Sequence, residues 1–506
     1  MSNNTKQSQN GPGYHPRPDP AYPGPINQKN VKNIFTQCED FQTREVFPAL
    51  DGPQPVTLCW VDGLVNGGSI SEDVLRPLTE DWRFAALKEG QELANLIMSG
   101  AVYSSTAKRR ETLDDLVADL MNGFCAILFD AAQLAVTFEV KTSNIRAISE
   151  PSTEKSVKGS KDSFVETLRV NTSLVRRKLK TPRLKSRSTI IGRKSETPAV
   201  VMYVEQIASD QLVQDIMDRL DAIDIDGLIA AGDLEEYVVD DPNTPFPQML
   251  HTERPDKFAT ALLDGQVGIL IDGLPNGFIL PATFANFLRV PEDESQHYAV
   301  ATSLRILRWG ALLLSLTLPA LLVAISMYHQ EMIPTNLLIS MIDAKQRVPF
   351  NVTVEVLSML AAFELLQEAG LRLPDTVGQT VSIIGALIVG QSAVEARVVS
   401  PIAVIIVALA GITGYTIPSQ DLSYALRLCR FLLVLAASGA GLFGVAAGLV
   451  LLVWHLSSIE SFGVAYTSPL TDTGKHGVLR TLVRAPIRQD KFRDEFPGVQ
   501  DRRRQK

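Results

Sequence analysis

Three glutamates lie inside an otherwise apolar stretch, "VPFNVTVEVLSMLAAFELLQEAGLRLP". Of all residues in the chain, they are the clearest candidates for a chemical role. On a helix, Glu364 and Glu368 are one turn apart and share a face, whereas Glu355 lies near the start on about the opposite side. A charge that faces lipid at the bilayer centre costs ~2.5 to 3.5 kcal/mol on insertion scales. We therefore expect these carboxylates to face protein or water, in an aqueous cavity or at a subunit contact.

A second polar pair follows on the next apolar segment. Gln391 and Glu395 are also one helical turn apart, so they would extend the polar path of the glutamates. An alternative stays open, in which the acidic side chains reach the membrane interface and form salt bridges to Arg372 or Arg397.

Other chemistry has little support in the sequence. We find no glycine-rich phosphate loop and no catalytic Ser or Cys constellation, and the six histidines are scattered, so neither an enzyme nor a cofactor nor a metal is expected. Cys38, Cys59, Cys125 and Cys429 are too far apart in the sequence to suggest a disulfide framework or a zinc site. We expect four unreactive thiols in a reducing compartment.

The composition changes along the 506 residues and indicates several regions. These regions must position the glutamates and glutamine described above. Residues 1–30 are rich in Pro, Gly and Asn and predict a disordered tail without a secretory signal. The formal net charge of −8 argues against nucleic acid as a partner. The stretch Arg169 to Ser188 is strongly basic and lies in a predicted linker, 151–198. It could bind anionic lipid, an acidic partner or nucleic acid, or simply be a solvated linker.

The region before residue 300 contains two pairs of similar segments, and all four have α/β character. "VTLCWVDGLVNGGSISEDVLRPL" resembles "VVMYVEQIASDQLVQDIMDRL", and "GFCAILFDAAQLAVTFEV" resembles "GQVGILIDGLPNGFILPATF", each pair being separated by about 143 residues. Each copy has a short apolar strand before a helix, and later a predicted hairpin. We predict two similar α/β subdomains, 31–150 and 199–300, each with a sheet covered by helices.

Residues 301–460 are predicted to form an all-α, multi-span membrane domain. Trp309 to Tyr328 and Phe431 to Leu456 are long enough to cross the ~30 Å hydrocarbon layer. Gly378 to Ala396 and Val398 to Tyr415 are further candidates. A face that a second helix can approach closely is predicted from small residues at every fourth position, Ala436, Ala440, Gly444 and Gly448.

The count of apolar segments raises a question of topology. Five crossings would leave the two termini on opposite sides, but the tail 461–506 is basic and favours the cytoplasm, as do Arg305 and Arg308 before the first span. We therefore expect four spans and one re-entrant segment. The glutamate-bearing stretch, bounded by Pro349 and Pro374, is the predicted re-entrant one.

From about Val31 to Pro486 the sequence resembles the A-subunit family of bacterial spore germination receptors, the GerA type, which includes SpoVAF-like proteins. The resemblance is carried by motifs such as "VDGLVN", "FPQMLHTERPD", "EAGLRLP" and "LVRAPIRQD". Two positions depart from the family pattern: a second proline is usual where Asn351 stands, and an additional acidic residue where Leu360 stands.

The resemblance implies a multi-pass protein of the inner spore membrane whose N-terminal domain lies on the cytoplasmic, or core, side. It implies a transporter-like B-subunit, a lipoprotein C-subunit and a homo-oligomer that forms a nutrient-gated channel. An acidic pore lining would favour cations. Two alternatives stay open: a SpoVAF-like accessory channel for ion or dipicolinate release, and a non-conducting membrane scaffold. The implied pore residues are Glu355, Glu364, Glu368, Gln391 and Glu395.

Overall fold

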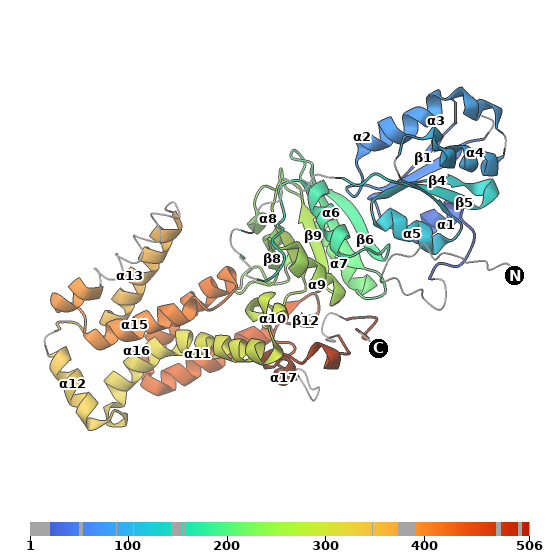
Figure 1. Ribbon diagram of the computed structural model, residues 1–506. Coiled ribbons are helices and arrows are strands. Elements are labelled where there is room, and N and C mark those ends of the chain that lie inside the picture. The colour runs from blue at the N-terminus through green and yellow to red at the C-terminus, as the bar shows by residue number, and fades with distance from the viewer. Residues whose placement is uncertain are drawn as a thin grey trace.

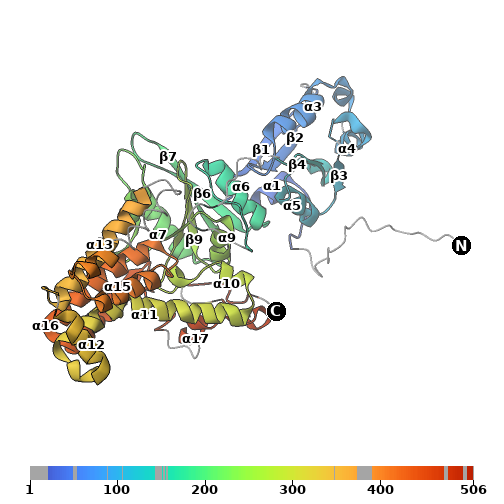
Figure 2. The ribbon, with the colours of Figure 1, turned by 60° about the vertical axis from the view of Figure 1, so that its left-hand side comes forward.

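The computed structural model places two α/β units and a helical part along one chain (Figure 1). It describes residues 21–504 except 50–53, 88, 105, 143–150, 152–153, 155–157, 347, 373–389, 472–476 and 494–497. The first unit lies at one end, the second unit in the middle, and most of the helical part at the other end. Figure 2 shows the same order from a second direction.

The first unit is a five-stranded antiparallel sheet with helices on both faces. Alternate residues of its central strand β4 point to opposite faces: Ile127 packs in one apolar cluster and Leu128 in the other. Both clusters are buried, which explains why β4 is an uninterrupted apolar run. In spatial order the strands are β1 (Phe41–Val46), β2 (Val56–Val61), β4 (Phe124–Phe129), β5 (Leu134–Glu139) and β3 (Ala107–Arg110).

The helices of the first unit divide between the two faces of this sheet. The longest, α5, begins at a Thr112 cap and presents Leu116 and Leu120 to one face. That face is covered by α1 (Gln28–Ile34) and α5 (Leu113–Met121); the other is covered by α3 (Arg76–Glu80), α4 (Gly90–Leu96) and the adjoining π-helical turns Ile70–Leu75 and Ile97–Ala101.

The second unit repeats this connectivity. Its strands follow one another in space as β6 (Leu184–Ile191), β7 (Thr197–Val204), β9 (Val267–Ile271), β10 (Gly277–Leu280) and β8 (Leu250–Thr252). The hairpins β4–β5 and β9–β10 occupy the segments where the sequence predicts them. One face is covered by α7 (Asp210–Asp221) and α8 (Ala231–Val238), the other by α6 (Leu168–Lys178) and α9 (Pro255–Leu263).

The segment expected to be a basic linker differs most from its prediction. Residues 168–191 form α6 and β6, so the second unit begins within the range 151–198. Arg176 is 1% exposed, and its guanidinium binds both carboxylate oxygens of Asp40 at 2.6 and 2.7 Å. Its third contact is the carbonyl of Leu184, at 2.6 Å. This basic residue therefore joins the two units instead of facing solvent or lipid.

In the described residues of the helical part, the longer helices are α11 (Tyr298–Tyr328), α12 (Thr335–Lys345), α13 (Val352–Arg372), α15 (Pro401–Gly414) and α16 (Gln420–Ser458). Within the described ranges, α11 and α16 are long and apolar enough to cross a membrane, while α15 is apolar but shorter. The predicted span Gly378 to Ala396 lies mostly outside the described residues.

Helix α16 is two helical arms that fold back on one another. Gly441 has φ +60° and ψ −139°, a conformation that L-residues with a side chain rarely adopt. A Cβ atom on Gly448 would lie 2.5 Å from Leu433, although a straight helix would separate these positions by ~22 Å. The predicted single span Phe431 to Leu456 is therefore wrong, because the chain reverses at Gly441.

Both ends of this hairpin lie beside the second unit. Near its start, Asp421 is 3.1 Å from His251 of β8, and near its end His455 is 2.8 Å from Thr244. The turn lies at the opposite end of the bundle, where the Tyr328 hydroxyl donates to the carbonyl of Ser438. Each arm therefore crosses the length of the bundle.

The stretch expected to be re-entrant is one uninterrupted helix, α13, of 21 residues. At 1.5 Å per residue it is about 30 Å long, the length of a full crossing. Its direction follows from contacts with α15: Glu355 meets Ser400 at the start of α15, and Gln367 meets Tyr415 just after its end. The two helices run parallel.

The C-terminal region packs against the second unit. Tyr466 is fully buried beside Phe284 and Phe287, and Val499 packs on Gly265. Arg493 donates to the carbonyl of Leu263 at 2.6 Å. The range 461–506, expected to be a basic tail, thus uses a basic side chain to hold the chain end on the α/β unit.

Candidate functional site

Glu355 occupies the first turn of α13, and its side chain is fully buried. The Asn351 side chain caps this helix by accepting the N–H of Val354 at 2.9 Å. The Oε2 atom of Glu355 accepts the N–H of Ser400 at 2.9 Å, at the N-terminus of α15, where the helix dipole favours a negative charge. Among the described residues, Oε1 has no hydrogen-bond partner.

Glu364 lies further along α13 and forms an ion pair with α16. Its carboxylate is 3.0 Å from the guanidinium of Arg427, and both side chains are mostly buried. One turn away, the Gln367 amide donates to the Tyr415 hydroxyl at 2.8 Å. The acidic face predicted on α13 therefore meets a basic residue at a mostly buried contact, and beside it an exposed tyrosine hydroxyl.

Arg430 adds a second guanidinium to this cluster. The residue is 4% exposed and lies on the same arm as Arg427, three residues later. It donates to the Ser315 hydroxyl of α11, and a Cβ atom on Gly414 would lie 3.2 Å from its Nη2. The absence of a side chain at Gly414 gives the guanidinium room.

These two arginines were not among the residues predicted from the sequence. They precede Phe431, where the predicted span began, and charges at a span boundary are ordinarily assigned to the interface. Their spacing was the available signal, because positions three apart share a helical face. The hairpin in α16 brings that face into the bundle.

The remaining predicted polar residues lie on exposed surface. Glu368 is exposed on α13, one turn beyond Glu364. Gln391 and Glu395 are exposed on the helical segment 390–395, and the Gln391 amide donates to Glu395 at 2.8 Å. This chain alone thus encloses Glu355 and most of Glu364 but leaves the other three open.

The predicted packing face, Ala436, Ala440, Gly444 and Gly448, surrounds the turn of α16. A Cβ atom on Gly444 would overlap the carbonyl oxygen of Ala436, and one on Gly448 would contact Leu433. The small residues allow the two arms of the same chain to approach closely, whereas we had expected them to receive a separate helix.

The second unit meets the helices through the motif "FPQMLHTERPD". Arg254 of this motif is 1% exposed and binds Asp256 at 2.7 Å and Glu292 at 2.5 Å. A polar cavity of about 340 Å³ lies beside it, between β8, α9, the segment 286–292 and residues 418–421. The motif forms the junction between the sheet and the helices.

Two carboxyl groups near this junction have shifted pKa values. Burial and the charge of Asp421 raise the pKa of Glu235, on α8, to about 7. Burial would raise the pKa of Asp293 also, but hydrogen bonds and charge from Arg308 and Arg305 hold it below its usual range. Asp293 therefore anchors the start of α11 as a charged group.

Metal and disulfide chemistry have no support within the described ranges. No group of three or more His, Cys, Asp or Glu side chains there is arranged to hold a metal ion. Cys38, Cys59, Cys125 and Cys429 are free thiols, and burial raises the pKa of Cys38.

Comparison with known proteins identifies the family. Residues 29–496 match the family described as Bacillus/Clostridium GerA spore germination protein. The chain belongs to the GerA spore germination family. It is 38% identical to spore germination protein KA of Bacillus subtilis, over 96% of this chain and 89% of that protein. It is 32% identical to spore germination protein B1 of the same organism, over 95% and 98% of the two chains.

Other GerA-type relatives include a protein without an assigned role. An uncharacterized membrane protein of B. subtilis, YfkQ, is 37% identical over 91% of this chain and 88% of its own. A crystal structure of the N-terminal domain of the A subunit of the Bacillus megaterium spore germinant receptor GerK3 shares 28% identity. It covers 51% of this chain and 93% of its own, with a TM-score of 0.41.

Proposed function

We propose that this GerA-family chain is the A-subunit of a germinant receptor and forms, as a homo-oligomer in the inner spore membrane, a nutrient-gated cation channel. The observation that carries the proposal is α13, a helix of crossing length whose glutamates Glu355 and Glu364 point into the bundle. Membership in a spore germination family supports the biological setting. A transporter-like B-subunit and a lipoprotein C-subunit are the proposed partners.

The contacts favour six crossings and therefore an even number. The C-terminal region contacts the second unit, so both regions lie on one side of the membrane. The crossings would be α11, α13, the predicted segment Gly378 to Ala396, α15 and the two arms of α16. The reversal at Gly441 supplies the crossing that the sequence count lacked, so a re-entrant segment is no longer required.

Labelling of single cysteines tests this topology. Gly439→Cys, beside the exposed turn of α16, is expected to react only from the face opposite the α/β units. Thr471→Cys, exposed near the second unit, is expected to react only from the cytoplasmic face. Labelling of both positions from the same face would contradict the six-crossing arrangement.

In this proposal, the pairing of Glu364 with Arg427 belongs to the closed state of the channel. A carboxylate whose charge is compensated at 3.0 Å attracts a passing cation less than a free one does. Opening would separate this pair and expose Glu364 beside Glu368, concentrating cations along α13. A nutrient-bound partner would stabilise the separated arrangement, since a ligand shifts a conformational equilibrium only through its difference in affinity.

Ion flux through a reconstituted receptor tests the pore assignment. Glu364→Gln together with Glu368→Gln is expected to reduce nutrient-dependent cation flux at least tenfold and to weaken cation selectivity. Glu331→Gln, an exposed glutamate just after α11, is the matched control and is expected to leave flux unchanged. Wild-type flux in the double variant would remove the pore assignment, and no flux from an intact wild-type assembly would favour a scaffold.

A further inference from the structure

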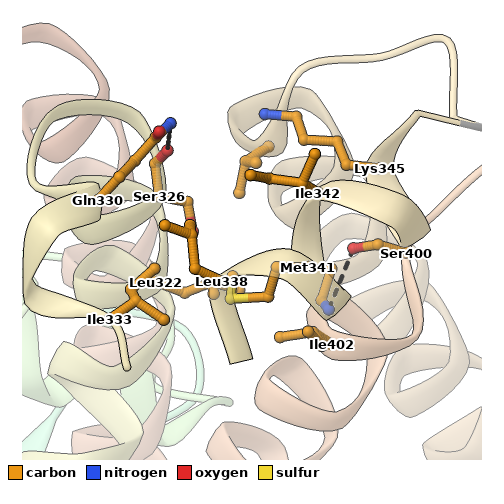
Figure 3. Close-up of a pocket in the computed structure, with 12 residues that line it drawn as sticks. Leu322, Ser326, Gln330, Ile333, Leu338, Met341, Ile342, Lys345, Ser400 and Ile402 are labelled. Atoms are coloured by element: carbon orange, nitrogen blue, oxygen red, sulfur yellow. Dashed lines mark hydrogen bonds between the residues drawn. The ribbon is translucent and has the colours of Figure 1, made fainter. Parts of the chain in front are cut away.

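A small pocket lies between α11, α12, α13 and α15, at the end of the bundle far from the two sheets (Figures 1 and 3). Its volume is about 50 Å³, enough for a short linear segment of alkyl chain but not for a bulky ring system. The wall is mainly apolar and is formed by Leu322, Ile333, Leu338, Met341, Ile342, Val352, Ile402 and Ala403.

Polar groups stand at one end of this pocket. Figure 3 shows the amine of Lys345 and the amide of Gln330 on opposite sides of the space between the helices. Gln330 donates to the carbonyl of Ser326 at 2.8 Å. Within the part of the chain that the structure describes, no carboxylate forms an ion pair with Lys345. The pocket thus combines an uncompensated cation with an apolar interior.

Helix α12 shows what surrounds this pocket. None of its residues is buried, although it carries Leu337, Ile339 and Ile342, which are 50%, 61% and 46% exposed. A short helix with exposed leucine and isoleucine side chains, at the end of a membrane bundle, fits the interface between headgroups and acyl chains. Lys345, at the C-terminal end of α12, would then lie at headgroup level.

We propose that this pocket binds an anionic phospholipid of the membrane leaflet opposite the α/β units. The negatively charged headgroup pairs with Lys345, and a segment of one acyl chain enters between Leu338 and Met341. Free fatty acids share this amphipathic, anionic chemistry, but the interfacial position of α12 favours a membrane lipid as the occupant. The inference rests on the membrane placement of the proposed function and not on channel activity.

The pocket also adjoins the buried carboxylate of the proposed pore. Ser400 and Val352 line it, and the N–H of Ser400 donates to Glu355. A lipid chain that holds α12 against α15 would keep Ser400 in place and preserve this hydrogen bond. Bound lipid would therefore stabilise the packed arrangement of α13 and α15.

Native mass spectrometry of the full chain tests the site. Protein in detergent is titrated with phosphatidylglycerol, phosphatidylcholine or decanoate. We expect retention of phosphatidylglycerol in preference to phosphatidylcholine, and roughly fivefold weaker retention by Lys345→Gln, the effect of one basic residue near an anionic headgroup. Lys345→Arg is expected to restore it. Leu338→Trp, which fills the pocket, is expected to lower retention without removing the charge.

Arg397→Gln is the matched control, because it removes an exposed positive charge close to the start of α15 without altering the pocket lining. Equal loss in Arg397→Gln and Lys345→Gln, or undiminished retention in Lys345→Gln, would overturn the assignment. Retention of decanoate but not phosphatidylglycerol would overturn the choice of a membrane lipid. Alkaline extraction of the same variants reports membrane insertion separately, so loss of the site is distinguished from loss of the membrane domain.

Discussion

The two α/β units share one connectivity but differ in what their edge strands contact. In the first unit, Ile127 pairs with Val136, which pairs with Arg109 of β3; in the second, Ile269 pairs with Phe278, which pairs with His251 of β8. Arg109 and His251 therefore occupy equivalent positions. Arg109 binds Glu111 within its own strand region at 3.1 Å, whereas His251 binds Asp421 of α16 at 3.1 Å.

The two units therefore share a fold but have different contacts, so we expect them to have different roles. The second unit holds both ends of the α16 hairpin and the C-terminal region. The first unit is joined to it through Asp40 and Arg176, next to the short parallel pairing of Cys38 with Ser186. We infer that the second unit couples to the helical part and that the first unit acts through the second.

The largest effect on stability is expected at the Asp40–Arg176 contact, which joins the two units. Arg176→Ala should lower the free energy of unfolding by about 3–5 kcal/mol, because it leaves the mostly buried Asp40 carboxylate without its partner. Urea titration with limited proteolysis checks this value. The control Arg83→Ala removes a solvent-exposed guanidinium from its pair with Asp81 and should change the free energy of unfolding far less. Similar costs for the two variants would show that the join is weak.

The next largest effects on stability are expected at two arginines, Arg254 and Arg110, near corresponding ends of the two units. Arg254→Ala is expected to cost about 3 kcal/mol and to loosen α10 (Glu292–Ser295), because the 1% exposed Arg254 binds two carboxylates, one of them on α10. Arg110→Ala should cost about 1–2 kcal/mol, since Arg110 is 25% exposed and, among the described residues, its guanidinium pairs with one carboxylate, that of Asp119. Proteolysis of each unit in the full chain gives both values, and the reverse order would contradict the proposed role of the second unit.

A pH effect on stability is expected from Glu235 of the second unit. The folded-state pKa of Glu235 is raised to about 7, so the folded chain binds a proton more tightly than the unfolded chain. Its contribution therefore lowers stability as pH rises from about 4.5 to about 7, by on the order of 1 kcal/mol after allowing for solvent screening. Glu235→Gln should flatten this slope in thermal unfolding between pH 5 and 7.5. An unchanged slope would exclude Glu235 as its source.

The smallest effects on stability are expected at the equivalent edge positions. Arg109→Ala and His251→Ala each remove a partly exposed contact and should cost at most about 1 kcal/mol. They should differ in protease sensitivity of the loop before α16, which only His251→Ala is expected to increase. Equal sensitivity in the two variants would indicate that the His251–Asp421 contact does not restrain the hairpin.

The sequence alone determined those elements that depend on residues close together in the chain. Alternating and continuous apolar runs predicted the hairpins β4–β5 and β9–β10. This works because apolar residues of a strand face the core, so the pattern of residue types along the chain shows which positions are buried. Repeated segments predicted the duplication, and motifs predicted the GerA family. The apolar composition after residue 300 predicted a helical region, in which α11 has spanning length and hydropathy as one helix and α16 is equally apolar but folds back at Gly441.

The tertiary structure decided what depends on contacts distant in sequence. Arg176 was expected in a solvated linker. Its partner Asp40 is 136 residues away in the sequence, so no local sequence pattern could predict that Arg176 is buried. The reversal at Gly441 requires a backbone angle that composition does not reveal, and it turned one predicted span into two arms. The pairing of Glu364 with Arg427 likewise exists only once α13 and α16 pack, because the chain must bring two helices together before either charge acquires its partner.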